Sequence, residues 1–116
     1  MLVGSADESL DVIRHVKSKH LGVNLDIGHC QVMGEHIPRT IKMLKERIFN
    51  VHLYDIKGRK HYHLIPGEGD IDFPSVFESL RSIGYDQYLT VELYTYPDKP
   101  VYAARKALSY LRQMLR

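Results

Sequence analysis

Several features that would define other classes of protein are scarce or missing in this chain of 116 residues. A single cysteine, Cys30, excludes an intrachain disulfide and is typical of a reducing compartment. No apolar run approaches the roughly 20 residues of a transmembrane helix, and the first residues lack the pattern of a secretory signal. The formal net charge of +2 is too small to indicate a nucleic-acid partner. We therefore expect a cytoplasmic protein with no membrane partner.

The composition that is present is typical of one globular domain. Apolar residues make up 44% of the chain and charged residues 26%, which is ordinary for a folded soluble protein. We find no low-complexity segment and no linker that would divide the chain, so residues 1–116 are expected to form a single domain. Seven histidines are a high number for this length and make a metal site worth considering.

Three short segments repeat one pattern, in which an apolar strand carries an ionisable side chain on one face. They are residues 23–27, 50–54 and 90–94. Because side chains alternate between the two faces of a strand, Asp26, His52 and Glu92 lie opposite the aliphatic residues of their segments. If helices cover the aliphatic faces, these three polar side chains share one interior.

Helical patterns separate the three strands. Ser5 and Glu8 form a capping box that begins a helix ending near residues 20–22. A second helix precedes the strand at 50–54, a third begins at Asp72 and ends at Gly84, and a fourth follows Pro100. Their predicted buried residues are Leu10, Ile13 and Val16; Ile37, Ile41, Leu44 and Ile48; Phe73, Val76, Phe77, Leu80 and Ile83; and Val101, Ala104, Leu108, Leu111 and Leu115. Residues 28–34 and 55–72 are predicted to be loops.

Strands that alternate with helices predict an α/β fold with a parallel sheet and right-handed crossovers. Polar residues on one face of the sheet favour a closed barrel, in which ligand groups lie at the carboxyl ends of the strands. A complete barrel of this kind needs about 250 residues, whereas this chain has three clear strands and a possible fourth at Leu2 and Val3. We therefore expect a partial (β/α) TIM barrel. Its open edges would be completed by association, as in a homo-oligomer, or by a missing N-terminal half.

Two carboxylates and an imidazole in a shared interior are costly unless another group compensates their charge. A divalent cation is the simplest compensation for Asp26, His52 and Glu92, and manganese and zinc both suit this set of ligands. The alternative is a buried network of ion pairs and hydrogen bonds that stabilises the barrel interior. The residues alone leave both interpretations open.

Four motifs resemble the C-terminal half of the xylose-isomerase-like barrel superfamily, which includes sugar (phosphate) isomerases and epimerases and the endonuclease IV family. The motifs are residues 24–29 (NLDIGH), 52–57 (HLYDIK), 63–73 (HLIPGEGDIDF) and 84–92 (GYDQYLTVE). They follow the order and spacing of the family over nearly the whole chain. The resemblance implies that Asp26, His52 and Glu92 are metal ligands. It also implies a further glutamate ligand, on the strand before Ser5, that this chain does not contain.

The resemblance implies roles for residues in the loops as well. His29 and His63 would contact the substrate, and His29 would ligate a second metal in the endonuclease branch. His61 stands where that branch has an aspartate, which disfavours a multi-zinc phosphodiesterase site. Lys57 would neutralise a substrate phosphate or an enediolate. Cys30 is expected to be a packed thiol rather than a nucleophile.

These observations favour a metal-dependent sugar (phosphate) isomerase or epimerase that transfers protons through an enediolate. The resemblance makes Glu92 one half of the acid/base pair, and the other half is the missing glutamate. Two alternatives remain open from the sequence. One is an endonuclease IV-like hydrolase of abasic DNA, and the other is a half-barrel that binds a partner or a metal without catalysis.

Overall fold

The structure is a computed structural model that describes residues 4–115. Its elements along the chain are α1 (Ala6–Val16), β1 (Val23–Asp26), α2 (Ile27–Val32), α3 (Ile37–Leu44), a 3₁₀ turn (Lys45–Arg47), β2 (Ile48–Leu53), β3 (Asp55–Lys57), β4 (Lys60–Leu64), α4 (Phe73–Ser82), β5 (Leu89–Val91) and α5 (Pro100–Arg112). None of the helices within residues 4–115 combines the length and the apolar character that a membrane crossing requires.

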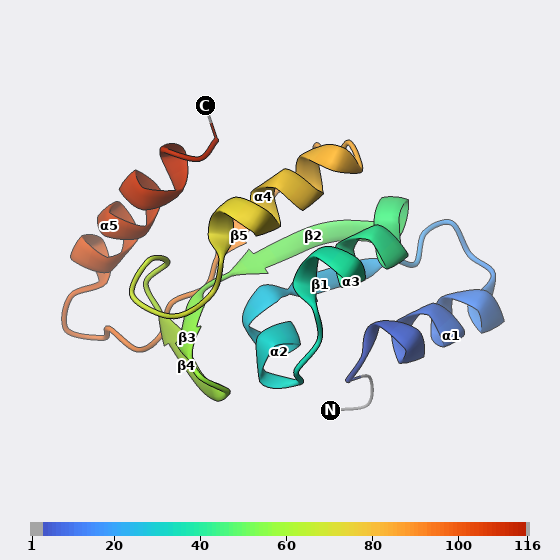
Figure 1. The fold of residues 1–116 in the computed structure, drawn as a ribbon, viewed down its shortest axis with the longest axis horizontal. Helices are drawn as coiled ribbons and strands as arrows, with labels where there is room; N and C mark the ends of the chain where they lie inside the picture. The colour runs from blue at the N-terminus through green and yellow to red at the C-terminus, as the bar shows by residue number, and fades with distance from the viewer. Residues whose placement is uncertain (1–3, 116) are drawn as a thin grey trace.

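Strands β1, β2 and β5 form a parallel sheet in the order β1-β2-β5. Helices α3 and α4 lie across the sheet, while α1 and α5 lie toward opposite ends of the molecule (Figure 1). The hairpin β3–β4 continues from the carboxyl end of β2 (Figure 1). The predicted α/β fold, a partial barrel with outer helices, is therefore confirmed with three parallel strands. The possible fourth strand at Leu2 and Val3 lies outside the described residues.

The two faces of this sheet differ sharply in character. On the helix side, Leu25, Val51 and Leu53 are at most 3% exposed, and each such buried side chain contributes about 1.5–3 kcal/mol. They pack in one core with apolar residues of α3 and α4: Ile37, Ile41, Leu44, Phe73, Val76, Phe77 and Leu80. The opposite face has the half-buried or exposed polar residues Asn24, Asp26, Asn50, His52, Thr90 and Glu92. This polar face is where the candidate site lies.

Two segments predicted as loops are regular structure. Residues 27–32 form α2, because the Asp26 carboxylate accepts a hydrogen bond from the His29 backbone N–H at 2.8 Å and caps the helix. Residues 55–64 form an antiparallel hairpin whose turn contains Gly58 with φ of +62°. The Lys- and His-rich sequence of the hairpin lacks the apolar alternation that would have indicated strands.

The buried stripe of α5 also differs from the prediction. Ala103, Ala107 and Leu111 are buried, whereas Val101, Leu108 and Leu115 are 46–61% exposed. The two alanines pack in a small separate cluster with Ile65, Val91 and Leu93. Two further boundaries change: Ile48 begins β2 instead of ending a helix, and the third strand of the sheet is only Leu89–Val91.

Within residues 4–115, β1 and β5 are each paired on one side only. A pocket of about 250 Å³ follows β1 and the start of α1. Another of about 370 Å³ lies beside β5 and is lined by Val91, Leu93 and Leu108. Both edges of the sheet are therefore open, with apolar surface beside them.

Candidate metal centre

Three neighbouring strands bring the predicted ligands together at their carboxyl ends. Asp26 and His52 are partners in the β1–β2 register, and the Glu92 backbone N–H donates to the Leu53 carbonyl at 3.0 Å just beyond β5. One ligand atom from each of Asp26, His52 and Glu92 lies within 4.8 Å of the other two. His52 Nδ1 is 3.1 Å from Glu92 Oε2. The side chains thus converge as the alternation along the strands predicts.

The chemistry of this trio fits a divalent cation. Two carboxylates and one imidazole provide the oxygen and nitrogen donors that manganese and zinc accept. The side chains of His52 and Glu92 are 26% and 38% exposed, so an ion from solvent can reach them. A cation would also reduce the repulsion between the carboxylates of Asp26 and Glu92.

His63 lies deepest in the site and is only 3% exposed. Its ring lies between those of Tyr54 and Tyr94, with centroid distances of 3.7 and 3.9 Å. His63 Nε2 is 3.6 Å from Glu92 Oε2, and Nδ1 has no hydrogen-bond partner among residues 4–115. Burial lowers the pKa of His63 despite the nearby Glu92, so the imidazole is neutral near pH 7.

Tyr54 stacks against the ring of His63. It is fully buried, and its hydroxyl is hydrogen-bonded to His61 Nε2 at 2.6 Å. Burial, with a contribution from Asp26, raises the pKa of Tyr54, so the phenol stays protonated. A Cβ atom at Gly28 would lie 1.9 Å from the Tyr54 ring, so only glycine fits there. Gly28 is therefore needed for the packing of Tyr54 against α2.

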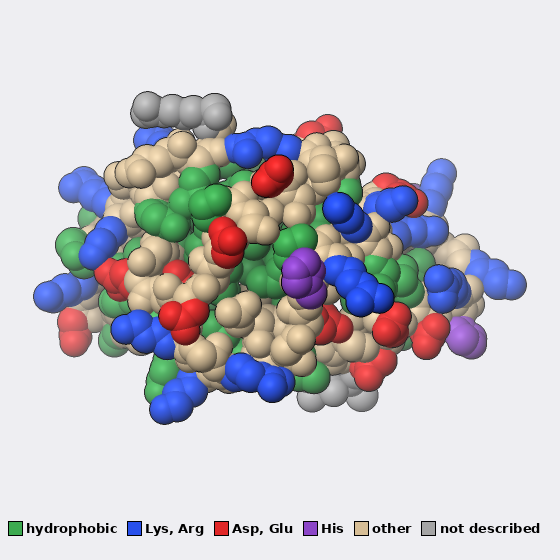
Figure 2. Space-filling view, viewed as in Figure 1, with side chains coloured by type: hydrophobic (Ala, Val, Ile, Leu, Met, Phe, Trp, Pro, Cys, Tyr) green, Lys and Arg blue, Asp and Glu red, His purple; other side chains and the backbone are tan. Residues whose placement is uncertain are grey.

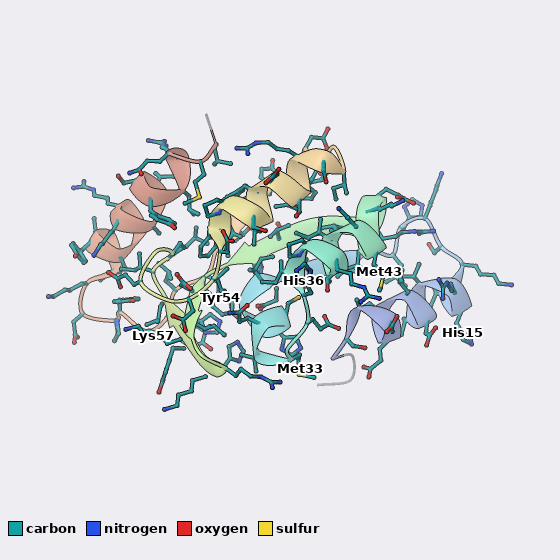
Figure 3. All side chains as sticks on the ribbon, in the orientation of Figure 1. His15, Met33, His36, Met43, Tyr54 and Lys57 are labelled. Atoms are coloured by element: carbon teal, nitrogen blue, oxygen red, sulfur yellow. The ribbon has the colours of Figure 1, made fainter. Side chains whose placement is uncertain are left out.

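His29 and Lys57 are the other residues that were predicted to contact the substrate. His29 is half-buried on α2, with Nε2 3.3 Å from the Gly4 carbonyl and its ring 6.4 Å from that of His61. Lys57 is exposed at the end of β3, beyond the point where Tyr54 follows β2 (Figure 3). No hydrogen bond or ion pair within residues 4–115 joins Lys57 to the trio. Cys30 is buried, which raises its pKa to about 12 and keeps the thiol protonated.

Asp55 organises the loop that follows the hairpin. This carboxylate is fully buried and accepts hydrogen bonds from four backbone N–H groups, those of Ile56, Gly67, Gly69 and Ile71, at 2.9–3.0 Å. A Cβ atom at Gly69 would lie 2.5 Å from Asp55 Oδ1. The segment of residues 67–69 is therefore a turn whose backbone N–H groups surround the Asp55 carboxylate.

Several residues of the site are not indicated by the motifs in the sequence. No pattern in the sequence indicates that Tyr54 and Tyr94 enclose His63. Asn24, Asn50 and Thr90 each lie two residues before a proposed ligand, and because side chains alternate along a strand this spacing is a signal that places them on the same polar face. The buried Asp55 could have been suspected because it directly follows a strand and a glycine-rich turn lies downstream.

Comparison with known proteins identifies the class of fold. Residues 1–114 match the model of the xylose isomerase-like TIM barrel family. The chain belongs to this family. The resemblance of the four motifs to this family is thereby confirmed.

Three known proteins that resemble this chain are the following. Fructoselysine 3-epimerase of Escherichia coli O157:H7 is 31% identical over 98% of this chain and 42% of its own length. Inosose dehydratase of Mesomycoplasma hyopneumoniae is 30% identical over 97% of this chain and 44% of its own length. The crystal structure of a D-tagatose 3-epimerase-like protein has a TM-score of 0.86 and 30% identity, covering 99% of this chain and 42% of that one. The chain thus spans less than half the length of these relatives.

Proposed function

We propose that this chain is the C-terminal half of a metal-dependent sugar (phosphate) isomerase or epimerase. The observation that carries the proposal is the convergence of Asp26, His52 and Glu92 within 4.8 Å at the carboxyl ends of adjacent strands. The similarity to sugar epimerases supports the substrate class. Asp26, His52 and Glu92 would hold a manganese or zinc ion.

A cation held by this trio would polarise a sugar carbonyl and stabilise negative charge on its oxygen. Glu92 would exchange a proton with the carbon next to the carbonyl, so that the substrate passes through an enediolate. The neutral His63 lies 3.6 Å from the Glu92 carboxylate and would orient it or a sugar hydroxyl. His29 would contact the same substrate from the start of α2, and Lys57 would act only on a substrate phosphate that extends over the hairpin.

Proton return on the opposite side of the substrate needs a second acid/base group. The resemblance assigns that role to a glutamate on the strand that would pair with β1. The open edges of β1 and β5 fit this requirement, because further strands could pair there. These strands would come from a second copy of the chain or from an N-terminal half. Only an N-terminal half would bring the glutamate that the resemblance implies, because this chain does not contain it. Acidic and basic side chains are interspersed on the helix face in Figure 2, which does not favour a nucleic-acid partner.

The proposal is tested by metal binding and by proton exchange. After treatment with a chelator, the chain should bind Mn²⁺ or Zn²⁺ in calorimetry, and Glu92→Gln should weaken binding at least about tenfold. Glu78→Gln, on the exposed surface of α4, is the control. Keto-sugars incubated in D₂O with the metal-loaded chain should gain deuterium next to the carbonyl in NMR spectra.

Three results would contradict this assignment. The first is equal ion affinity in the wild type and in Glu92→Gln, which would leave the buried-network interpretation of the trio. The second is chelator-sensitive cleavage of an abasic-site oligonucleotide without any deuterium exchange, which would support the endonuclease alternative. A chain that binds neither metal nor sugar would be a non-catalytic half-barrel.

A further inference from the structure

The motif at residues 63–73 contains one acidic side chain that neither the metal centre nor the Asp55 turn explains. Glu68 lies in this turn, between the two glycines whose N–H groups donate to the Asp55 carboxylate. Its own carboxylate has other partners: Oε1 accepts from Lys106 Nζ of α5 at 2.6 Å, and Oε2 accepts from the Tyr96 hydroxyl at 3.1 Å. Glu68 therefore joins three segments, which are the turn after β4, the loop after β5 and helix α5.

The Tyr96 hydroxyl forms two hydrogen bonds, and the direction of each is fixed. The hydrogen bond from Lys106 lowers the pKa of Glu68, so this carboxylate is ionised near pH 7 and can only accept. The hydroxyl therefore gives its proton to Glu68, and its oxygen accepts the backbone N–H of Ile65 at 3.0 Å. One side chain thus attaches the loop after β5 to the turn after β4 at two points.

The two attached segments differ in how firmly the rest of the protein holds them. In the turn, the Asp55 carboxylate holds the backbone on both sides of Glu68, and Ile65 is only 1% exposed. In the loop, every residue from 94 to 99 is exposed except Tyr96. Tyr96 is therefore the point at which an exposed loop is attached to a well-held turn.

The same loop covers one side of the candidate site. It follows Glu92 and carries Tyr94, whose ring centroid lies 3.9 Å from that of His63. The other face of His63 lies on the fully buried Tyr54. Tyr94 is 65% exposed, whereas His63 is 3% exposed. The Tyr94 ring therefore separates His63 from solvent, and it does so only while the loop keeps this position.

We propose that Tyr96 and Glu68 are positioning residues that hold the loop after β5 in place and keep Tyr94 over His63. A single hydroxyl then determines how far solvent and substrate reach His63, which lies 3.6 Å from the proposed acid/base group Glu92. The consequence for a sugar substrate rests on the proposed function, whereas the contacts and their test do not.

The chemical accessibility of His63 reports the position of the loop. Diethyl pyrocarbonate modifies accessible neutral imidazoles, and tandem mass spectrometry gives the rate at each histidine of the 116-residue chain. Tyr96→Phe keeps the ring but removes both hydrogen bonds, so the rate at His63 should rise about tenfold, as expected for the loss of two hydrogen bonds. Tyr88→Phe is the matched control, because it removes a hydroxyl from a side chain that is 80% exposed. The exposed His20 is the internal reference.

Two further variants distinguish this attachment from a structural ion pair between the turn and α5. Lys106→Met removes the ion pair and leaves both hydrogen bonds of Tyr96. Glu68→Gln removes the charge but still offers an amide oxygen to the Tyr96 hydroxyl. Both variants should modify His63 at a rate close to that of the wild type, because a half-exposed ion pair contributes little.

The inference is overturned if Tyr96→Phe leaves the rate at His63 unchanged, or if Lys106→Met raises it as much as Tyr96→Phe does. Should Tyr96→Phe not fold, hydrogen exchange of the Ile65 N–H in the wild type decides: slow exchange supports the attachment, and exchange as fast as that of the exposed Thr95 refutes it. A wild-type chain that binds no Zn²⁺ would refute the metal centre and leave these results unchanged.

Discussion

Replacing Asp55 by asparagine should strongly destabilise the fold, because this carboxylate is an acceptor for four backbone N–H groups. Oδ1 accepts from Ile56 and Ile71, and Oδ2 accepts from Gly67 and Gly69. In asparagine one of these oxygens becomes an NH₂ group, so two N–H donors lose their acceptor in a fully buried position. Each orphaned group costs about 1–3 kcal/mol, so the expected loss is about 2–6 kcal/mol.

That loss is large compared with the total stability, which for a domain of this size is roughly 6–17 kcal/mol. Urea unfolding followed by circular dichroism measures the change in the free energy of unfolding. Asp70→Asn is the matched control, since Asp70 is exposed and accepts one backbone N–H, that of Gly58, which an amide oxygen can still accept. The reasoning is refuted if Asp55→Asn loses less than about 1 kcal/mol or no more than the control.

Two further predictions concern His63 and the open sheet edges. Burial lowers the pKa of His63, so as the pH falls this histidine is protonated in the unfolded chain before it is protonated in the folded chain. The free energy of unfolding should therefore fall as pH drops below about 6.5, by at most about 1.4 kcal/mol per pH unit. His63→Phe, which keeps the ring between the tyrosines, should lose this part of the slope in urea unfolding at pH 7 and 5.5, and equal slopes would contradict the prediction. The chain alone should sediment as an oligomer, and Leu108→Arg beside β5 should shift it toward monomer while Met43→Arg on α3 should not. A monomeric wild type at high concentration would mean that a different chain segment covers the edges.

The local sequence pattern was sufficient to predict features that depend on a single helix or strand. The caps at Ser5 and Asp72 appear where their side-chain oxygens meet unpaired helix N–H groups. The strand alternation placed Asp26 and His52 on the polar face because a period of two residues is a property of the backbone itself. The same kind of inference failed for α5, since alanines and larger apolar residues both repeat at helical spacing, and only contact with the sheet selects between the two faces.

The sequence by itself therefore determined the parallel α/β architecture, the polar face of the sheet and the three residues that converge on it. Tertiary structure alone decided that His63 is buried between Tyr54 and Tyr94. It also decided that the Asp55 carboxylate accepts hydrogen bonds from four backbone N–H groups. These arrangements join segments that lie far apart in the chain, through a hairpin and a turn without a periodic pattern. Their energies come from burial and hydrogen bonding across space, which no local spacing of residues encodes.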